Sequence, residues 1–227
     1  MMANKKKFAT GFFMLAAFIV VLILFFMPVF NGMNGLNYLD NLYNTISKGS
    51  ANYMDKMKKE AAPFKGEEVN VEIQLSSEEQ AAQTALLFMP VATVQHLGSR
   101  LQISGDLGRI LEAGLRDAES MFYNDGKALS GRYGYNERQG LYNWWSAFKA
   151  MDKHLKEQKK FKEAKVVDTI SAKAVETAYN YYGINPRSIS EKLGVVIFSL
   201  VFYVAYTLWY GFAILFMFEG WGLRLEH

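Results

Sequence analysis

Residues Phe8–Phe30 read FATGFFMLAAFIVVLILFFMPVF and include no charged side chain. A helix rises about 1.5 Å per residue, so this run is long enough to cross a hydrocarbon layer of about 30 Å. A second apolar run, Leu193–Phe218, reads LGVVIFSLVFYVAYTLWYGFAILFMF. Each run predicts a transmembrane helix. The first run is too long for the apolar part of a signal peptide, and no small-x-small cleavage site follows it, so we expect an uncleaved anchor.

The basic residues around the first run predict the orientation. Lys5, Lys6 and Lys7 precede it, and the next basic residue is Lys48. Positive charge stays on the cytoplasmic side, which favours a cytoplasmic N-terminus. Two spans then place the intervening residues outside the cytoplasm and return the C-terminus inside. We therefore expect a two-pass protein of the cell membrane, or of the inner membrane where the source has two.

This topology divides the chain into five segments. They are a cytoplasmic start (1–7), a first span (8–30), an extracytoplasmic domain (31–191), a second span (192–218) and a cytoplasmic tail (219–227). The last three residues, Leu225 to His227, resemble the start of an expression tag, so we leave them out of the functional reasoning.

Composition excludes several classes of function. The chain has 227 residues, and its charged residues, 21% of the total, lie almost entirely between the two runs. Basic and acidic residues balance in that middle, which argues against nucleic-acid binding. The absence of cysteine excludes disulfides and thiolate metal sites. Because no HExxH motif or Ser–His–Asp ordering appears, we expect no metal, no cofactor and no enzymatic activity. We expect the carboxylates to form solvated pairs, none of them in an apolar pocket.

The middle segment reads as mostly helical. Helical spacing and capping signals predict helices over residues 36–60, 76–97 with a kink at Pro90, 101–123, 141–160 and 166–182. Val69–Leu75 alternates apolar and polar residues and predicts one short strand. Its partner is open: a strand with a weaker signal, a strand of a neighbouring subunit, or none if the segment is an extended strap. The fold class is therefore mainly α, with two transmembrane helices flanking a mostly helical extracytoplasmic domain that holds one strand.

The second span contains a stripe of hydroxyl-bearing residues. At about 100° per residue, its members fall within an arc of roughly 100° on one helix face. A hydroxyl group without a partner in hydrocarbon costs about 1–3 kcal/mol. We expect this stripe to face a second copy of the chain or, alternatively, to line a pore. The stripe consists of Ser199, Tyr203, Tyr206, Thr207 and Tyr210.

A second candidate lies in the middle segment, where residues 132–145 read RYGYNERQGLYNWW. Tyrosine, tryptophan and arginine are the side chains that most often supply binding hot spots, although they are also common in protein cores. We expect this segment to bind a protein partner outside the cytoplasm. The candidate residues are Arg132, Tyr133, Tyr135, Arg138, Trp144 and Trp145.

The pattern as a whole predicts a non-enzymatic, homo-oligomeric membrane protein whose outer domain is a scaffold or partner-binding module. Its expected partners are the lipid bilayer, other copies of the chain and a protein outside the cytoplasm. One alternative is a channel lined by the second span. Against it, the two spans contain no ionisable residue before Glu219, and such residues commonly mark ion pathways. Another is an accessory subunit of a larger membrane complex.

Overall fold

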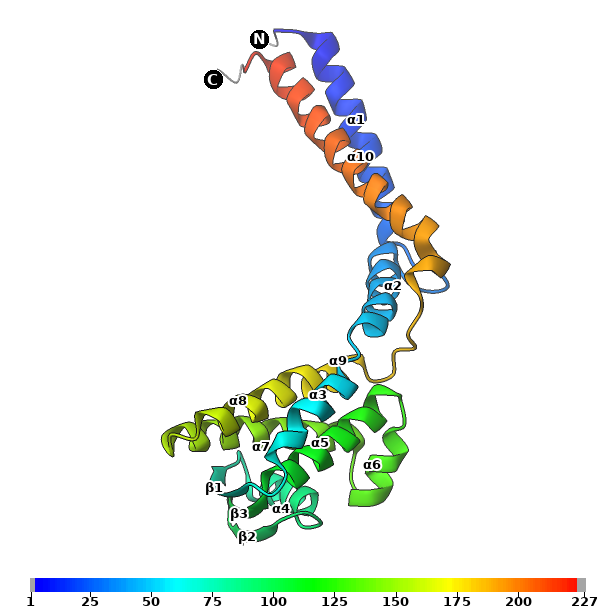
Figure 1. Cartoon of the computed structure of the whole chain (residues 1–227). Helices are drawn as coiled ribbons and strands as arrows, with labels where there is room; N and C mark the ends of the chain where they lie inside the picture. The colour runs from blue at the N-terminus through cyan, green and yellow to red at the C-terminus, as the bar shows by residue number, and fades with distance from the viewer. Residues whose placement is uncertain (1–2, 224–227) are drawn as a thin grey trace. The chain divides into compact units, whose positions relative to one another are not determined.

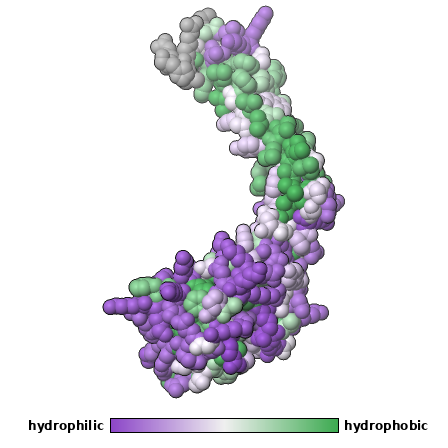
Figure 2. Space-filling model, viewed as in Figure 1, coloured by the Kyte–Doolittle hydropathy of each residue, from purple (hydrophilic) through white to green (hydrophobic). Residues whose placement is uncertain are grey.

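The chain folds as two units, shown together in Figure 1, a computed structural model that describes residues 3–223. The hairpin unit consists of the chain up to Ser47 and from Pro186 onward. The inserted unit consists of Lys48–Asn185. Figure 2 shows that apolar residues dominate the surface of the hairpin unit, whereas hydrophilic residues cover most of the visible face of the inserted unit.

The hairpin unit is built on two helices that are long and apolar enough to cross a membrane, α1 (Lys5–Phe26) and α10 (Ile189–Trp221). They run side by side in opposite directions (Figure 1). At one end of the pair the amide of Asn4 donates to the carbonyl of Gly220 at 3.0 Å. This unit also contains most of the helix α2 (Gly35–Ser50).

Close packing joins α1 to α10. A Cβ atom added at Gly11 would come within 2.6 Å of the Ala213 carbonyl oxygen, so glycine is what lets the backbones approach there. Further along, Trp209 Nε1 donates to the Met14 carbonyl at 3.1 Å. At the chain ends, Lys7 Nζ lies 2.6 Å from Glu219 Oε2. Both membrane-spanning candidates therefore belong to one antiparallel pair.

The helix boundaries differ from the predicted spans for local reasons. α1 ends at Phe26 rather than Phe30, because Pro28 forces the preceding Met27 into an extended conformation with ψ of 149°. α10 starts at Ile189, where the side chain of Ser188 accepts from the Ser190 amide and caps the helix. Apolar composition predicted where each span lies, whereas proline and capping residues set where each helix stops.

The inserted unit contains an antiparallel three-stranded sheet in the order β1-β3-β2. Its strands are β1 (Glu68–Gln74), β2 (Thr93–Leu97) and β3 (Arg100–Asp106). The single predicted strand is β1, and its partner is β3 of the same chain, with Val71 opposite Ile103. β3 is the strand whose signal in the sequence was too weak to predict. Because it pairs with β1 within the chain, β1 is neither an extended strap nor dependent on a strand from a neighbouring subunit.

Two predicted helices are shorter than expected because they gave up residues to this sheet. The helix predicted over 76–97 ends as α4 (Glu78–Phe88), since Pro90 lacks the amide that would continue it. The helix predicted over 101–123 begins only at Leu107, where the side chain of Asp106 accepts from the Arg109 amide. A tight turn at Gly98, with φ of +63°, joins the two missed strands.

The remaining helices of the inserted unit pack around α5 and α7, and one apolar core unites them with the inner face of the sheet. Leu107, Leu111, Phe148 and Met151 all lie fully buried in this core. The helices are α3 (Met54–Ala61), a 3-10 turn (Ala62–Phe64), α5 (Leu107–Phe122), α6 (Gly126–Tyr133), α7 (Glu137–Glu157), α8 (Phe161–Ile170), a π-helical segment (Ser171–Glu176) and α9 (Thr177–Tyr181).

A buried lysine lies where the chain enters and leaves the inserted unit. The side chain of Lys48 is only 1% exposed, and its ammonium donates to Asn124 Oδ1 and to the carbonyls of Tyr181 and Ile184 at 2.6–3.0 Å. Burial lowers the pKa of Lys48. Two of these bonds connect the first residue of the unit with its last turns, and the third connects it with the turn after α5.

Candidate functional site

The hydroxyl stripe predicted on α10 divides into an inward and an outward part. Ser199 is buried, its Oγ lies 2.7 Å from the Tyr43 hydroxyl, and it also donates to the Val196 carbonyl. Tyr206 stacks on Phe18 of α1, with ring centroids 4.3 Å apart. Both side chains therefore contact other residues of the same hairpin unit.

The more exposed part of the stripe consists of Tyr203, Thr207 and Tyr210, which we call the outer α10 face; Tyr210 is at its border, with its ring centroid 5.1 Å from that of Phe18. Tyr203 is 68% exposed and Tyr210 is 45% exposed. Within residues 3–223, neither of these two phenol groups has a hydrogen-bond partner, whereas Thr207 Oγ1 donates to the Tyr203 carbonyl. One helical turn beyond Thr207, a Cβ added at Gly211 would meet nothing within 4 Å. The outer α10 face thus combines unpartnered hydroxyl groups with open space beside it.

Two of the predicted partner-binding residues, Tyr133 and Trp144, lie inside the inserted unit, and a third, Arg132, reaches the same buried carboxylate from the surface. Trp144 and Asp117 are fully buried, and Trp144 Nε1 donates to Asp117 Oδ2 at 2.8 Å. The Tyr133 hydroxyl donates to the same oxygen at 2.6 Å, and Arg132 forms an ion pair with Oδ1. This buried cluster corrects the expectation that no carboxylate lies in an apolar pocket. Asp117, the residue that joins the cluster, was missed because it reads as one charge among many on an amphipathic helix.

The buried cluster changes the titration of its phenol. Burial, and after it the hydrogen bond to the Asp117 carboxylate, raises the pKa of Tyr133 to about 12. Burial likewise raises the pKa of Tyr135 to about 12. The hydroxyl of Tyr135 donates to the Gln83 carbonyl at 3.1 Å. Through these hydrogen bonds Tyr133 links α6 to α5, and Tyr135 links the segment between α6 and α7 to α4.

Trp145, unlike its neighbour Trp144, faces outward and lines a recess on the surface of the inserted unit. The recess has a volume of about 250 Å³ and is lined by Tyr142, Trp145, Glu176 and Tyr179. The rings of Tyr142 and Trp145 are nearly parallel, at 27°, with centroids 5.8 Å apart. We call this site the aromatic recess. Of the predicted binding residues, Arg138 lies beside it, with its guanidinium carbon 5.8 Å from the centre of the Tyr179 ring.

An irregular helix supplies the other wall of the aromatic recess. Residues Ser171–Glu176 are π-helical, and the Thr177 hydroxyl donates five residues back, to the Ala172 carbonyl at 3.3 Å. The wider turn inserts one extra residue and changes the direction of the side chains that follow, including Tyr179. Ordinary helical periodicity does not predict such a turn. Of the four lining residues, sequence reasoning therefore named Trp145 and missed Tyr142, Glu176 and Tyr179.

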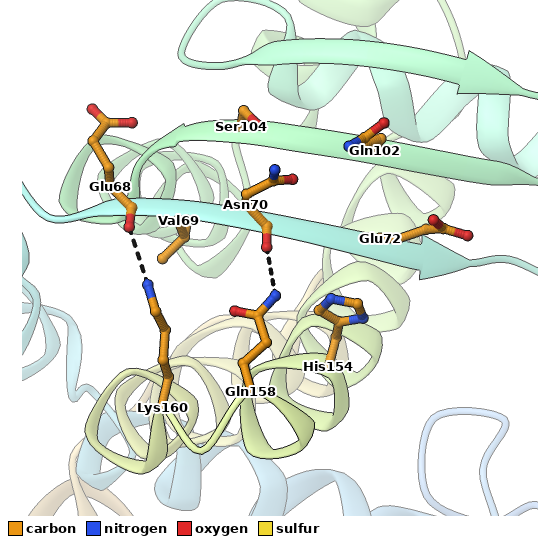
Figure 3. A pocket seen from close by; sticks show the side chains of 9 residues that line it. All are labelled: Glu68, Val69, Asn70, Glu72, Gln102, Ser104, His154, Gln158 and Lys160. Atoms are coloured by element: carbon orange, nitrogen blue, oxygen red, sulfur yellow. Dashed lines mark hydrogen bonds between the residues drawn. The ribbon is translucent and has the colours of Figure 1, made fainter.

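A larger, polar groove borders the free edge of β1 and is drawn in Figure 3. It has a volume of about 490 Å³ and includes His154 and Ser104. Gln158 Nε2 donates to the Asn70 carbonyl at 2.8 Å, and Lys160 Nζ donates to the Glu68 carbonyl at 3.2 Å (Figure 3). These two side chains cover outward-pointing carbonyls of an edge strand, which protects it from pairing with another chain.

In residues 3–223, no hydrogen bond links Ser104 to His154, and no group of three His, Asp or Glu side chains is placed to hold a metal ion. The described surface thus has two features on which a function can be proposed: an aromatic recess on the inserted unit and a hydroxyl-bearing helix face on the hairpin unit.

Comparison with known proteins gives no match to a protein-family model, a curated protein or a solved structure. The two candidate sites therefore stand on their own geometry.

Proposed function

We propose that this chain is a non-enzymatic, homo-oligomeric membrane protein whose inserted unit is held outside the cytoplasm as a scaffold or partner-binding module. The observation that carries the proposal is the outer α10 face, Tyr203, Thr207 and Tyr210, with two phenol hydroxyls unpartnered in residues 3–223. The orientation rests on Lys5, Lys6 and Lys7 preceding the first span.

The position of Tyr203 along α10 supports self-association. Tyr203 lies close to the middle of Ile189–Trp221, far from the interfacial belts where membrane tyrosines usually reside. Placing a phenol hydroxyl in hydrocarbon without a hydrogen-bond partner costs about 1–3 kcal/mol of free energy. A second α10 supplies acceptors for this hydroxyl, and each interhelical hydrogen bond contributes about 0.6 kcal/mol.

Small residues beside the tyrosines favour the same arrangement. Thr207 and Gly211 are one turn apart, and small residues at that spacing let two membrane helices approach closely. The equivalent positions on the inner side, Gly11 and Ala213, already join α10 to α1. We propose that α10 packs on its own hairpin through Ala213 and on another copy through the face that holds Tyr203 and Thr207, with Tyr210 at the border between the two faces.

The experiment is a mass measurement by light scattering in mild detergent. We expect the protein-only mass of the natural chain to be a multiple of 25.8 kDa. Tyr203→Leu combined with Tyr210→Leu should lower that mass, because it removes both outward hydroxyls. Tyr206→Phe is the matched control and should leave the mass unchanged, since that ring stacks on Phe18 within the chain.

Two results would overturn the proposal. One is a natural chain that stays monomeric over a broad concentration range, which would instead fit an accessory subunit. The other is a double variant whose mass equals that of the natural chain.

The aromatic recess supports the binding part of the proposal. Exposed tyrosine and tryptophan side chains are enriched where proteins recognise partners. Tyr142 is 43% exposed and Tyr179 is 37% exposed, so both rings are accessible. The other aromatic residues of the predicted segment, Tyr133 and Trp144, are occupied by Asp117. Trp145 is therefore the tryptophan through which this segment can meet a ligand.

A further inference from the structure

The aromatic recess contains a carboxylate and an indole that the rest of the described chain does not use. Within residues 3–223, Glu176 forms no ion pair or hydrogen bond, and Trp145 Nε1 has no acceptor. Two cations lie near this pair, and each already has contacts of its own, which for Arg138 include the Tyr179 ring at the recess. Arg138 donates to the Tyr182 carbonyl at 3.3 Å, and Lys173 lies over the ring of Tyr53 at 5.4 Å.

We infer that the aromatic recess binds a small alkylammonium cation, such as the trimethylammonium group of choline. Three electron-rich ring systems beside one free carboxylate form the chemical environment that favours an organic cation over a neutral or anionic ligand. This inference deepens the proposed binding role of the inserted unit and rests on it. It does not depend on self-association.

The existing contacts of the site show the same preference. The Arg138 guanidinium carbon lies 5.8 Å from the Tyr179 ring centre and 5.1 Å from the Tyr182 ring centre, both within the range of a cation–π contact. These rings therefore already attract positive charge. Glu176 takes no part in that contact, so its charge remains available to a ligand.

The size of the recess limits the ligand. Pockets for drug-sized molecules have volumes of about 300–1,000 Å³, and the recess has about 250 Å³. A small headgroup fits such a volume, whereas a bulky ligand does not. The four lining residues come from one wall on α7 and another on the π-helical segment and α9, so the site is preformed by packed helices.

The test uses the full chain in maltoside detergent, because detergents with choline headgroups would compete. Choline chloride is titrated and followed by ligand-observed NMR. Its neutral isostere, 3,3-dimethylbutan-1-ol, is titrated in parallel. We expect choline to bind with a dissociation constant in the millimolar range or tighter, and the neutral alcohol to bind at least about threefold more weakly, since the cation–π attraction requires charge.

Two variants locate the binding. Trp145→Ala and Glu176→Gln should each weaken choline binding by about three- to thirtyfold. Glu78→Gln is the matched control, because Glu78 is an exposed carboxylate at the start of α4, away from the recess. Thermal unfolding of each variant confirms that the inserted unit stays folded.

Several outcomes would overturn the inference. They are no choline binding to the folded natural chain, equal binding of choline and the neutral alcohol, or unchanged binding in both recess variants. Failure here is separable from failure of the proposed function. An oligomeric chain that ignores choline removes only this inference, whereas a monomeric chain that binds choline through Trp145 removes only the proposed assembly.

Discussion

Replacing Asp117 by Asn tests whether the buried cluster holds the inserted unit together. The carboxylate is fully buried and receives bonds from Arg132, Tyr133 and Trp144. Asparagine has almost the same shape, so the change removes charge and acceptor capacity without opening a cavity. One of its two polar atoms becomes a donor that faces other donors.

The expected loss follows from burial. The hydrogen bonds that the buried Tyr133 and Trp144 donate to this charged carboxylate are worth about 1.5–3 kcal/mol each, and the change to a neutral amide weakens both. Domains are stabilised by only about 5–15 kcal/mol in total. We therefore expect Asp117→Asn to remove a large part of the free energy of unfolding and to lower the melting temperature by on the order of 10 °C or more.

The assay is thermal unfolding of the full chain in mild detergent, followed by near-ultraviolet circular dichroism. The matched control is Glu119→Gln on the same helix. Glu119 Oε1 lies 2.6 Å from Lys58 Nζ, but their side chains are 30% and 44% exposed. Exposed ion pairs contribute about 0.2–1 kcal/mol, so the control should lose less than about 1 kcal/mol. Equal losses in the two variants, or a loss under about 1 kcal/mol in Asp117→Asn, would refute the reasoning.

Three further outcomes follow from the structure. The pKa values of Tyr133 and Tyr135 are raised to about 12 from a usual value near 10. The folded state thus keeps protons that the unfolded state releases, and the free energy of unfolding should fall as pH rises from about 10 to about 12. Denaturant titrations check this, and replacing both residues by Phe should flatten that slope. Gly211→Leu should lower the detergent-solubilised mass, whereas Gly194→Leu, also with open space around it but on another face of α10, should not; equal masses would contradict a specific helix contact. Lys48→Met should destabilise the inserted unit by about 1–3 kcal/mol in the same unfolding assay, because it removes the three hydrogen bonds that the buried ammonium donates, and an unchanged melting temperature would show that these bonds contribute nothing.

The strands show where local pattern reading succeeded and failed. β1 was predicted because its alternation is strict, with Val69, Val71 and Ile73 all buried. β3 buries only Leu101 and Ile103 in alternation, and Ser104 and Gly105 within the strand interrupt the apolar pattern, so its signal merged with that of α5. Pairing with β1 decides that this segment is extended, and such a long-range contact leaves little trace in the local sequence.

The candidate residues divide in the same way. Sequence reasoning chose Trp144 and Trp145 together, because composition cannot distinguish adjacent tryptophans. Successive helix positions differ by about 100°, so one of them enters the core and meets Asp117 while the other faces the aromatic recess. The π-helical turn that places Glu176 at the recess could not be predicted from the spacing of apolar residues.

The two spans can be predicted from the sequence by itself, because the apolar character of twenty or more consecutive residues is a local property that does not depend on what packs against them. The capping serines at Ser77 and Ser188 are equally local, since each acts on backbone amides a few residues away. Only the tertiary structure decided which of the hydroxyl groups and rings already has a partner within the chain. Ser199 and Tyr206 of the stripe contact their own hairpin while Tyr203 does not, and that depends on which helix lies opposite, a fact that no local pattern contains.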